Sequence, residues 1–191
     1  MNKKETMRIS DSCIEYDCSD YPYAEFKNKT TLHASEISAY TSSFLPPALL
    51  TKQGNIFFVS KVYEGELVSF CLRNHIDKVD IQDNWYLILE EFLDTEITEK
   101  EKERTYTLLE RVGISRTLCE QIRKELAPLM IEYNFISCLW EWCFLGMYDL
   151  LMAAQGKFIK TKIKLESQQI DELYNYAVKI ALMQSDSKVD L

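Results

Sequence analysis

The hydrophobic positions in the central part of the chain recur with helical spacing. In residues 83–94, DNWYLILEEFLD, one helix face collects the apolar side chains Trp85, Ile88, Leu89, Phe92 and Leu93. A second helix is indicated by Thr98 and Glu101, which have the spacing of a capping box. Gly113 would end this helix, because glycine favours the left-handed conformation of a C-terminal cap.

Three further segments are expected to be helical. Ser115 favours the start of a helix that Pro128 would stop or kink, because proline lacks an amide hydrogen. A last helix with the sequence SQQIDELYNYAVKIALM would begin at Ser167. Ser35 would cap a short helix, SEISAYTSSF, that the prolines at 46 and 47 would stop.

Strand patterns are fewer than helical ones. Residues 55–73 fit a hairpin with its turn at Glu64–Gly65, and they fit a helix nearly as well. A cleaner alternation lies at 158–165, where apolar residues share one face and lysines the other. The sequence therefore predicts a mainly α fold, a single-domain helical bundle with room for a small β element built from 56–72 and 158–165.

The length of 191 residues fits one domain. We expect residues 1–34 to be a partly ordered arm, 35–184 a single helical domain, and 185–191 a flexible tail. The arm is acidic and carries tyrosines at positions 16, 21 and 23. It would either bind a partner as a peptide or pack its aromatic rings on the domain, and the second is favoured because exposed aromatic rings promote aggregation.

Residues 135–154 read FISCLWEWCFLGMYDLLMAA and carry the two carboxylates Glu141 and Asp149. At the centre of a bilayer each carboxylate would cost about 3 kcal/mol, which argues against a membrane span. We expect this stretch to be the buried centre of the domain, with a break near 144–146. Glu141 would then be a structural carboxylate that accepts hydrogen bonds.

Cysteines and histidines do not form a recognisable metal site. No apolar run follows MNKKETMRISDSC, so we expect no secretory signal, a cytoplasmic location and free thiols. Cys13, Cys18 and His33 could meet in a loop, but no fourth ligand follows at a telling spacing. We expect neither a metal nor a cofactor.

The common catalytic motifs are absent from the sequence. Neither His33 nor His75 lies in an E-x-x-H or H-E-x-x-H setting, and there is no glycine-rich phosphate loop and no G-x-S-x-G. These absences favour a non-enzymatic protein. An enzyme with an unrecognised acidic site, near Glu141, is kept as an alternative.

Residues 105–126, TYTLLERVGISRTLCEQIRKEL, resemble a helix-turn-helix of the bacterial repressor kind. Gly113 falls at the turn, whereas Leu109 occupies a position that these motifs usually keep small. The residues that would face the DNA groove are Arg116, Thr117, Gln121 and Arg123. Because the net charge of −8 opposes phosphate contact, a DNA-binding regulator is an alternative, and nucleic acid is not the expected partner.

Nearly all the excess negative charge lies in residues 77–103, which contain ten acids and three lysines. This segment is either a solvated face or a docking surface for a basic protein, where charge would raise the association rate. The residues expected to bind the partner are Glu90, Glu91, Asp94, Glu96 and Glu99.

Three phrases, WYLILEEFLDTEI, IRKELAPLMIEYN and EWCFL, resemble a family of small uncharacterised bacterial helical proteins. The matching residues are Trp85, Phe92, Leu93, Asp94, Thr95, Glu96, Glu125, Pro128, Asn134, Glu141 and Trp142. The match covers about 85–152, and Trp140 stands where the family has glycine. The resemblance implies a compact helical unit of the type found among toxin-neutralising accessory proteins, and it brings no catalytic residues.

Taken together, these features predict a cytoplasmic bacterial protein that binds another protein and catalyses no reaction. It would resemble an immunity protein or antitoxin, with the acidic surface offered to a basic partner such as a toxin. We expect no association with membranes.

Overall fold

The computed structural model of the protein describes residues 7–17, 21, 23–93, 96–137, 144–156 and 165–184, with the backbone alone for 135–137. The chain divides into two compact units. Unit 1 comprises the residues up to Ile81 together with Ser167–Tyr174. Unit 2 comprises Gln82–Glu166 and the residues from Asn175 onward.

Unit 1 begins with a three-stranded antiparallel sheet in the order β1-β2-β3. Its strands are β1 (Met7–Ile9), β2 (Cys13–Tyr16) and β3 (Thr31–His33), with α1 (Ala24–Asn28) between the last two. In β2 the side chains alternate, because Ile14 and Tyr16 are buried while Glu15 is exposed. The segment expected as an arm therefore contains paired strands and buried aromatic rings.

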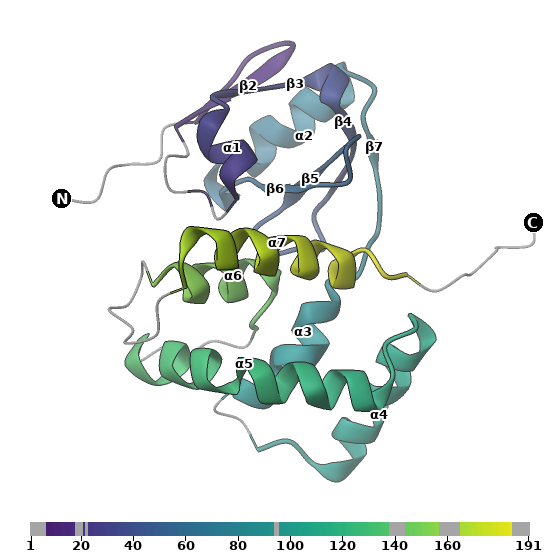
Figure 1. The fold of residues 1–191 in the computed structure, drawn as a ribbon. Helices are drawn as coiled ribbons and strands as arrows, with labels where there is room; N and C mark the ends of the chain where they lie inside the picture. The colour runs from purple at the N-terminus through teal and green to yellow at the C-terminus, as the bar shows by residue number, and fades with distance from the viewer. Residues whose placement is uncertain are drawn as a thin grey trace, which may run out of the picture. The chain divides into compact units, whose positions relative to one another are not determined.

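A second sheet in unit 1 has the strand order β6-β5-β4-β7, and Figure 1 shows these strands side by side. Its strands are β4 (Ile37–Thr41), β5 (Ala48–Thr51), β6 (Ile56–Phe58) and β7 (Asp77–Lys78). Consecutive strands β4, β5 and β6 are antiparallel, and β7 is parallel to β4. The short helices η1 (Ala34–Glu36) and η2 (Lys61–Tyr63) precede β4 and α2 (Glu64–Arg73), respectively.

Two tyrosine hydroxyls cover the outer edge of β6. The Tyr21 hydroxyl accepts from the Phe58 amide at 2.9 Å and donates to the Ile56 carbonyl at 2.9 Å. The Tyr174 hydroxyl, from the first half of α7 (Ser167–Ala181), accepts from the Ile56 amide at 2.9 Å. Because an unpaired strand edge invites aggregation, these bonds protect the sheet.

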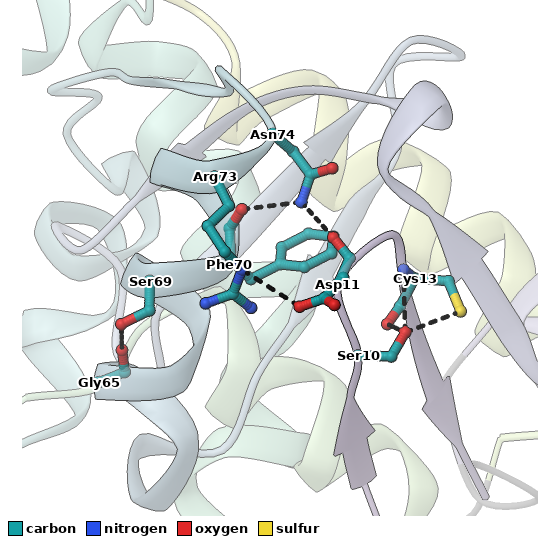
Figure 2. Close-up of polar contacts among 8 residues, drawn as sticks. All are labelled: Ser10, Asp11, Cys13, Gly65, Ser69, Phe70, Arg73 and Asn74. Atoms are coloured by element: carbon teal, nitrogen blue, oxygen red, sulfur yellow. Dashed lines mark hydrogen bonds and ion pairs between the residues drawn. The ribbon is translucent and has the colours of Figure 1, made fainter.

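The turn between β1 and β2 is held by the C-terminal end of α2, as Figure 2 shows. The Asn74 side-chain amide donates to the Asp11 carbonyl at 2.7 Å and to the Phe70 carbonyl at 2.9 Å. The Arg73 guanidinium lies 3.5 Å from the Asp11 carboxylate. Within the turn, the Ser10 hydroxyl donates to the Cys13 carbonyl at 2.8 Å. The α2 end thus connects the helix to the first sheet.

Unit 2 is helical in its described part. It contains α3 (Asn84–Leu89), η3 (Glu90–Phe92), α4 (Glu99–Arg111), α5 (Arg116–Ser137), α6 (Met147–Gln155) and the end of α7. Trp85 is fully buried and its indole N–H donates to the Ala177 carbonyl at 2.8 Å. The apolar core side chains contributed by α4, the described part of α5 and the turn between them are Leu109, Ile114, Cys119, Ile122, Leu129, Met130 and Tyr133.

The expected mainly helical bundle is wrong, since the described residues contain two sheets of three and four strands as well as seven α-helices. Residues 37–41, expected in a helix, form β4. Of the two interpretations of 55–73, the hairpin is wrong and the helix is right for the second half, because β6 is followed by α2. The other half of the expected β element lies almost wholly outside the described residues, since only Leu165 of 158–165 is described. The fold is therefore mixed α and β.

Several local predictions in unit 2 are confirmed. Thr98 and Glu101 form the capping box of α4, and Gly113 has a positive φ of 82° after its end. The stretch 144–146 is not helical, so α6 begins at Met147, as the predicted break requires. In contrast, α5 continues past Pro128, so the proline does not stop it.

Candidate functional site

The charged side chains of unit 2 form three groups, of which the first is a pair of buried aspartates. Asp83 caps α3 through its Oδ1 atom, which accepts from the Trp85 amide at 3.0 Å. Its Oδ2 atom accepts from the Met147 amide at 2.9 Å, at the start of α6. One carboxylate therefore caps two helices.

Asp149 is the second member of this pair. Its Oδ2 atom accepts from the Gly146 amide at 2.8 Å, which closes the capping box of α6. Gly146 is required here because a Cβ atom at this position would lie 2.6 Å from Asp83 Oδ2. The two carboxylates thus accept from two consecutive backbone amides, one on each side of the Gly146 Cα atom.

Burial controls the ionisation of this pair. The pKa of Asp83 is raised to about 6 by burial, against the lowering effect of its two amide hydrogen bonds. Burial also raises the pKa of Asp149 to about 7, with the charge of Asp83 acting in the same direction. Each residue is only 7% exposed, so we interpret the pair as structural rather than as a site that meets a substrate.

Arg123 is the centre of the second group. Its guanidinium donates to the carbonyls of Ile88 at 2.9 Å and Leu87 at 3.1 Å, at the end of α3. It lies 2.9 Å from the Glu91 carboxylate and 3.7 Å from that of Glu90. Arg123 is 6% exposed, so this cation is buried, and its two counter-charges lie between it and the surface, with Glu90 18% and Glu91 55% exposed.

Tyr106 of α4 lies between two arginines of α5. The guanidinium carbon of Arg116 is 4.3 Å from the centre of the tyrosine ring, and that of Arg123 is 5.5 Å away. Arg116 also pairs with Glu103 at 2.5 Å. Charge and aromatic contacts therefore join α4 to α5.

The third group consists of the acidic residues expected to bind a partner. Glu90 has a side-chain exposure of 18% and lies against Arg123, whereas Glu91 is 55% exposed. Glu96 is exposed, and Glu99 is 85% exposed while pairing with Lys102 at 2.9 Å. Asp94 lies outside the described residues. Three of the five side chains are therefore at the surface.

The residues of the DNA-binding alternative lie in different environments. The helix-turn-helix segment does form two helices around Gly113, with Thr117 and Gln121 exposed on the second. Arg116 is ion-paired, and Arg123 is buried and directed at α3. This arrangement brings Thr117 and Gln121 to the surface but not Arg123.

Other expected site residues are only partly described. Cys13 and His33 are cross-strand neighbours of β2 and β3, while Cys18 lies outside the described residues, as do Glu141, Trp140 and Trp142. Among the residues that the structure describes, no group of three His, Cys, Asp or Glu is arranged to hold a metal ion. In the same part of the chain, no helix combines the length and apolar character needed to cross a bilayer.

Sequence reasoning missed Asp83 as a bridging cap. Its position just before Asn84-Trp85 is that of an N-cap, but its bond to Met147 joins residues 64 positions apart. A local signal did exist for Asp149, which follows Gly146 at the spacing of a capping box. Asn134, a residue of the family pattern, donates to the Phe92 carbonyl at 2.7 Å and so stabilises the end of η3.

Comparisons of the chain with protein-family models, curated proteins and solved structures found no match.

Proposed function

We propose that the protein is a non-enzymatic protein-binding protein whose acidic surface, formed by Glu91, Glu96 and Glu99, docks a basic protein partner. In this proposal the protein acts as an immunity-type or antitoxin-like factor in the cytoplasm. The partner type rests on the resemblance of residues 85–152 to toxin-neutralising accessory proteins. Free Cys13, Cys71 and Cys119 support a reducing compartment.

The observation that carries the proposal is the exposure of the three carboxylates. The Glu91 side chain is 55% exposed, the Glu99 side chain is 85% exposed, and Glu96 is exposed as well. Two nearby cations are engaged by carboxylates: Lys102 by Glu99, and Arg123 by Glu90 and Glu91. The remaining negative charge is available to attract a basic partner and to raise its association rate.

The experiment is affinity capture from a lysate of the source cells, with mass spectrometry of the retained proteins. The bait is compared with the double variant Glu96→Lys/Glu99→Lys. We expect the wild-type bait to retain a protein of basic isoelectric point and the variant to retain at least about tenfold less of it. Capture should also weaken as ionic strength increases, because screening acts on exposed charges.

The matched control is Glu66→Lys/Asp77→Lys, which changes the net charge equally at exposed positions of unit 1. It should retain the partner at close to the wild-type level. Equal losses in both double variants would mean that net charge alone is responsible. Such a result, or undiminished capture by the Glu96/Glu99 variant, would refute the proposed surface.

A further inference from the structure

The buried aspartate pair of unit 2 differs from the other buried charge of that unit in having no cation beside it. Asp83 and Asp149 are each 7% exposed, and in the described part of the chain neither forms an ion pair with Lys, Arg or His. Arg123, which is equally buried, has two carboxylates within 4 Å. A buried charge without a counter-ion is costly, so such groups tend to become neutral.

Packing prevents the two carboxyl groups from moving apart. Asp83 Oδ2 accepts from the Met147 amide and Asp149 Oδ2 accepts from the adjacent Gly146 amide. Gly146 lies so close to Asp83 that even a methyl group at this position would overlap the Oδ2 atom. Two like charges held at adjacent amides repel each other, and one proton relieves that repulsion.

Among the described residues, the other side chains whose electrostatics are coupled to the pair are neutral at ordinary pH. Tyr133, 1% exposed on α5, faces Asp149, and Tyr148 of α6 lies near Tyr133. Trp85 contributes its backbone amide from α3. Besides these, the N-terminal amides of α3 and α6 provide partial positive charge, which lowers the pKa of both carboxyl groups and opposes the larger effect of burial.

We propose that Asp83 and Asp149 form a proton-binding pair that holds a proton in weakly acidic solution and releases it near neutral pH, and that loss of this proton loosens the start of α6. The pair then makes the stability of unit 2 sensitive to pH. This inference is independent of the acidic docking surface.

The direction of the effect follows from burial. Both groups have pKa values raised from the ordinary 3.8, to about 6 and about 7. A folded state that binds protons more tightly than the unfolded chain is stabilised at low pH. The contribution is therefore complete below about pH 4 and is lost as the pH rises through 6 and 7.

The test compares the thermal unfolding of wild type and Asp149→Asn at pH 5 and pH 8. The asparagine side chain of this variant still offers an oxygen to the Gly146 amide but cannot ionise. We expect the stability of the variant to increase relative to that of the wild type as the pH rises. The ratio of their unfolding constants should change by at least about tenfold between the two pH values, since one unit of pKa shift corresponds to tenfold.

Glu101→Gln is the matched control, because Glu101 occupies the same capping-box position in α4 but is exposed. Its hydrogen bonds to Thr98 lower the pKa of Glu101 from 4.5, so it stays ionised at both pH values. The difference between this variant and wild type should not change from pH 5 to pH 8. If the Asp149→Asn difference is equally constant, the pair does not bind a proton in this range and the proposal is wrong.

A second measurement needs no variant. Hydrogen exchange of the Gly146 and Met147 amides in the wild-type protein, corrected for intrinsic rates, should show protection at least about tenfold weaker at pH 8 than at pH 5. The Ile114 amide, which donates to the Leu109 carbonyl at 2.9 Å, is the reference in the same unit. Unchanged protection of Gly146 and Met147 relative to Ile114 would also overturn the proposal.

Discussion

The starts of α4 and α6 use the same hydrogen bond in different surroundings. In α4 the Glu101 carboxylate accepts from the Thr98 amide at 2.8 Å, and in α6 the Asp149 carboxylate accepts from the Gly146 amide at 2.8 Å. The exposed Glu101 has a lowered pKa because of its bonds to Thr98, whereas burial raises the pKa of Asp149 to about 7. Surroundings, rather than the local motif, decide whether each carboxylate is charged.

The same difference shows that not every acidic residue in the sequence adds negative charge to the surface. Residues 77–103 contain ten acids, but Asp83 is buried at two helix ends and Glu90 lies against Arg123. The start of α4 keeps its carboxylates at the surface, where they can attract a partner. The start of α6 keeps its carboxylates inside, where they affect folding. Under the proposed function, only carboxylates of the first kind would contribute to docking.

The largest effect is expected from a charge that is buried but paired. Arg123→Met should reduce the free energy of unfolding by about 3 kcal/mol, because it leaves Glu90 without its counter-charge and two α3 carbonyls without a donor. Chemical denaturation measures this loss. Arg116→Met, at a side chain that is 45% exposed against the same Tyr106 ring, is the control and should have a much smaller effect. Equal losses would mean that burial is not what distinguishes the two arginines.

A smaller effect is expected from Gly146→Ala, which tests the tight packing at the start of α6. The added methyl group would lie 2.6 Å from Asp83 Oδ2, so the free energy of unfolding should fall by about 1–3 kcal/mol. Gly65→Ala is the control, since no atom lies within 4 Å of a Cβ atom there and alanine favours the α2 helix. The denaturation midpoint should fall for Gly146→Ala and rise for Gly65→Ala. A Gly146→Ala protein of unchanged stability would show that Asp83 is not packed tightly against Gly146.

The smallest effect concerns the start of α4. Thr98→Ala removes the hydroxyl that accepts from the Glu101 amide at 3.3 Å and should reduce the free energy of unfolding by about 1 kcal/mol. Thr98→Ser retains the hydroxyl and should be close to wild type. Thermal unfolding of the three proteins side by side measures both. A Thr98→Ala variant as stable as the wild type would mean that the exposed capping box contributes little to the free energy of unfolding.

The start and end of α4 could be predicted because their determinants are local. Thr98 and Glu101 are three residues apart, and Gly113 supplies a conformation that other residues rarely adopt. The helical spacing from Trp85 was right only in part: Trp85, Ile88 and Leu89 are buried in α3, but the helix ends at Leu89 and leaves Phe92 and Leu93 half-buried beyond it. Determinants that lie within one helical turn can therefore be recognised from the sequence without knowledge of the tertiary structure.

The sheets of unit 1 were not predicted, because their strands are only two to five residues long and alternate poorly. In β4 the consecutive residues Ala39, Tyr40 and Thr41 are all buried, so the two-residue period is lost. At 64–73 the Glu-Gly pair suggested a turn, whereas Glu64 and Glu66 occupy the first turn of α2, where acids are favourable.

The charged groups of unit 2 could be predicted only in part, because contacts between distant residues decide their state. Glu91, Glu96 and Glu99 lie at the surface as the acidic segment indicated. In contrast, Arg123 was expected to face a DNA groove and is directed at α3 instead. Its partners lie 32 to 36 positions earlier in the chain, beyond the reach of any local pattern.

The comparison of α4 with α6 is tested most directly by a carbon-13 NMR titration that follows the carboxyl groups of Glu101, Asp83 and Asp149 in one sample. We predict midpoints near pH 6 and pH 7 for the two aspartates and a midpoint below 4.5 for Glu101. The contrary result is an Asp149 midpoint at or below its ordinary value of 3.8. Burial would then not distinguish the two capping boxes, and the α6 pair would be ionised like the surface acids.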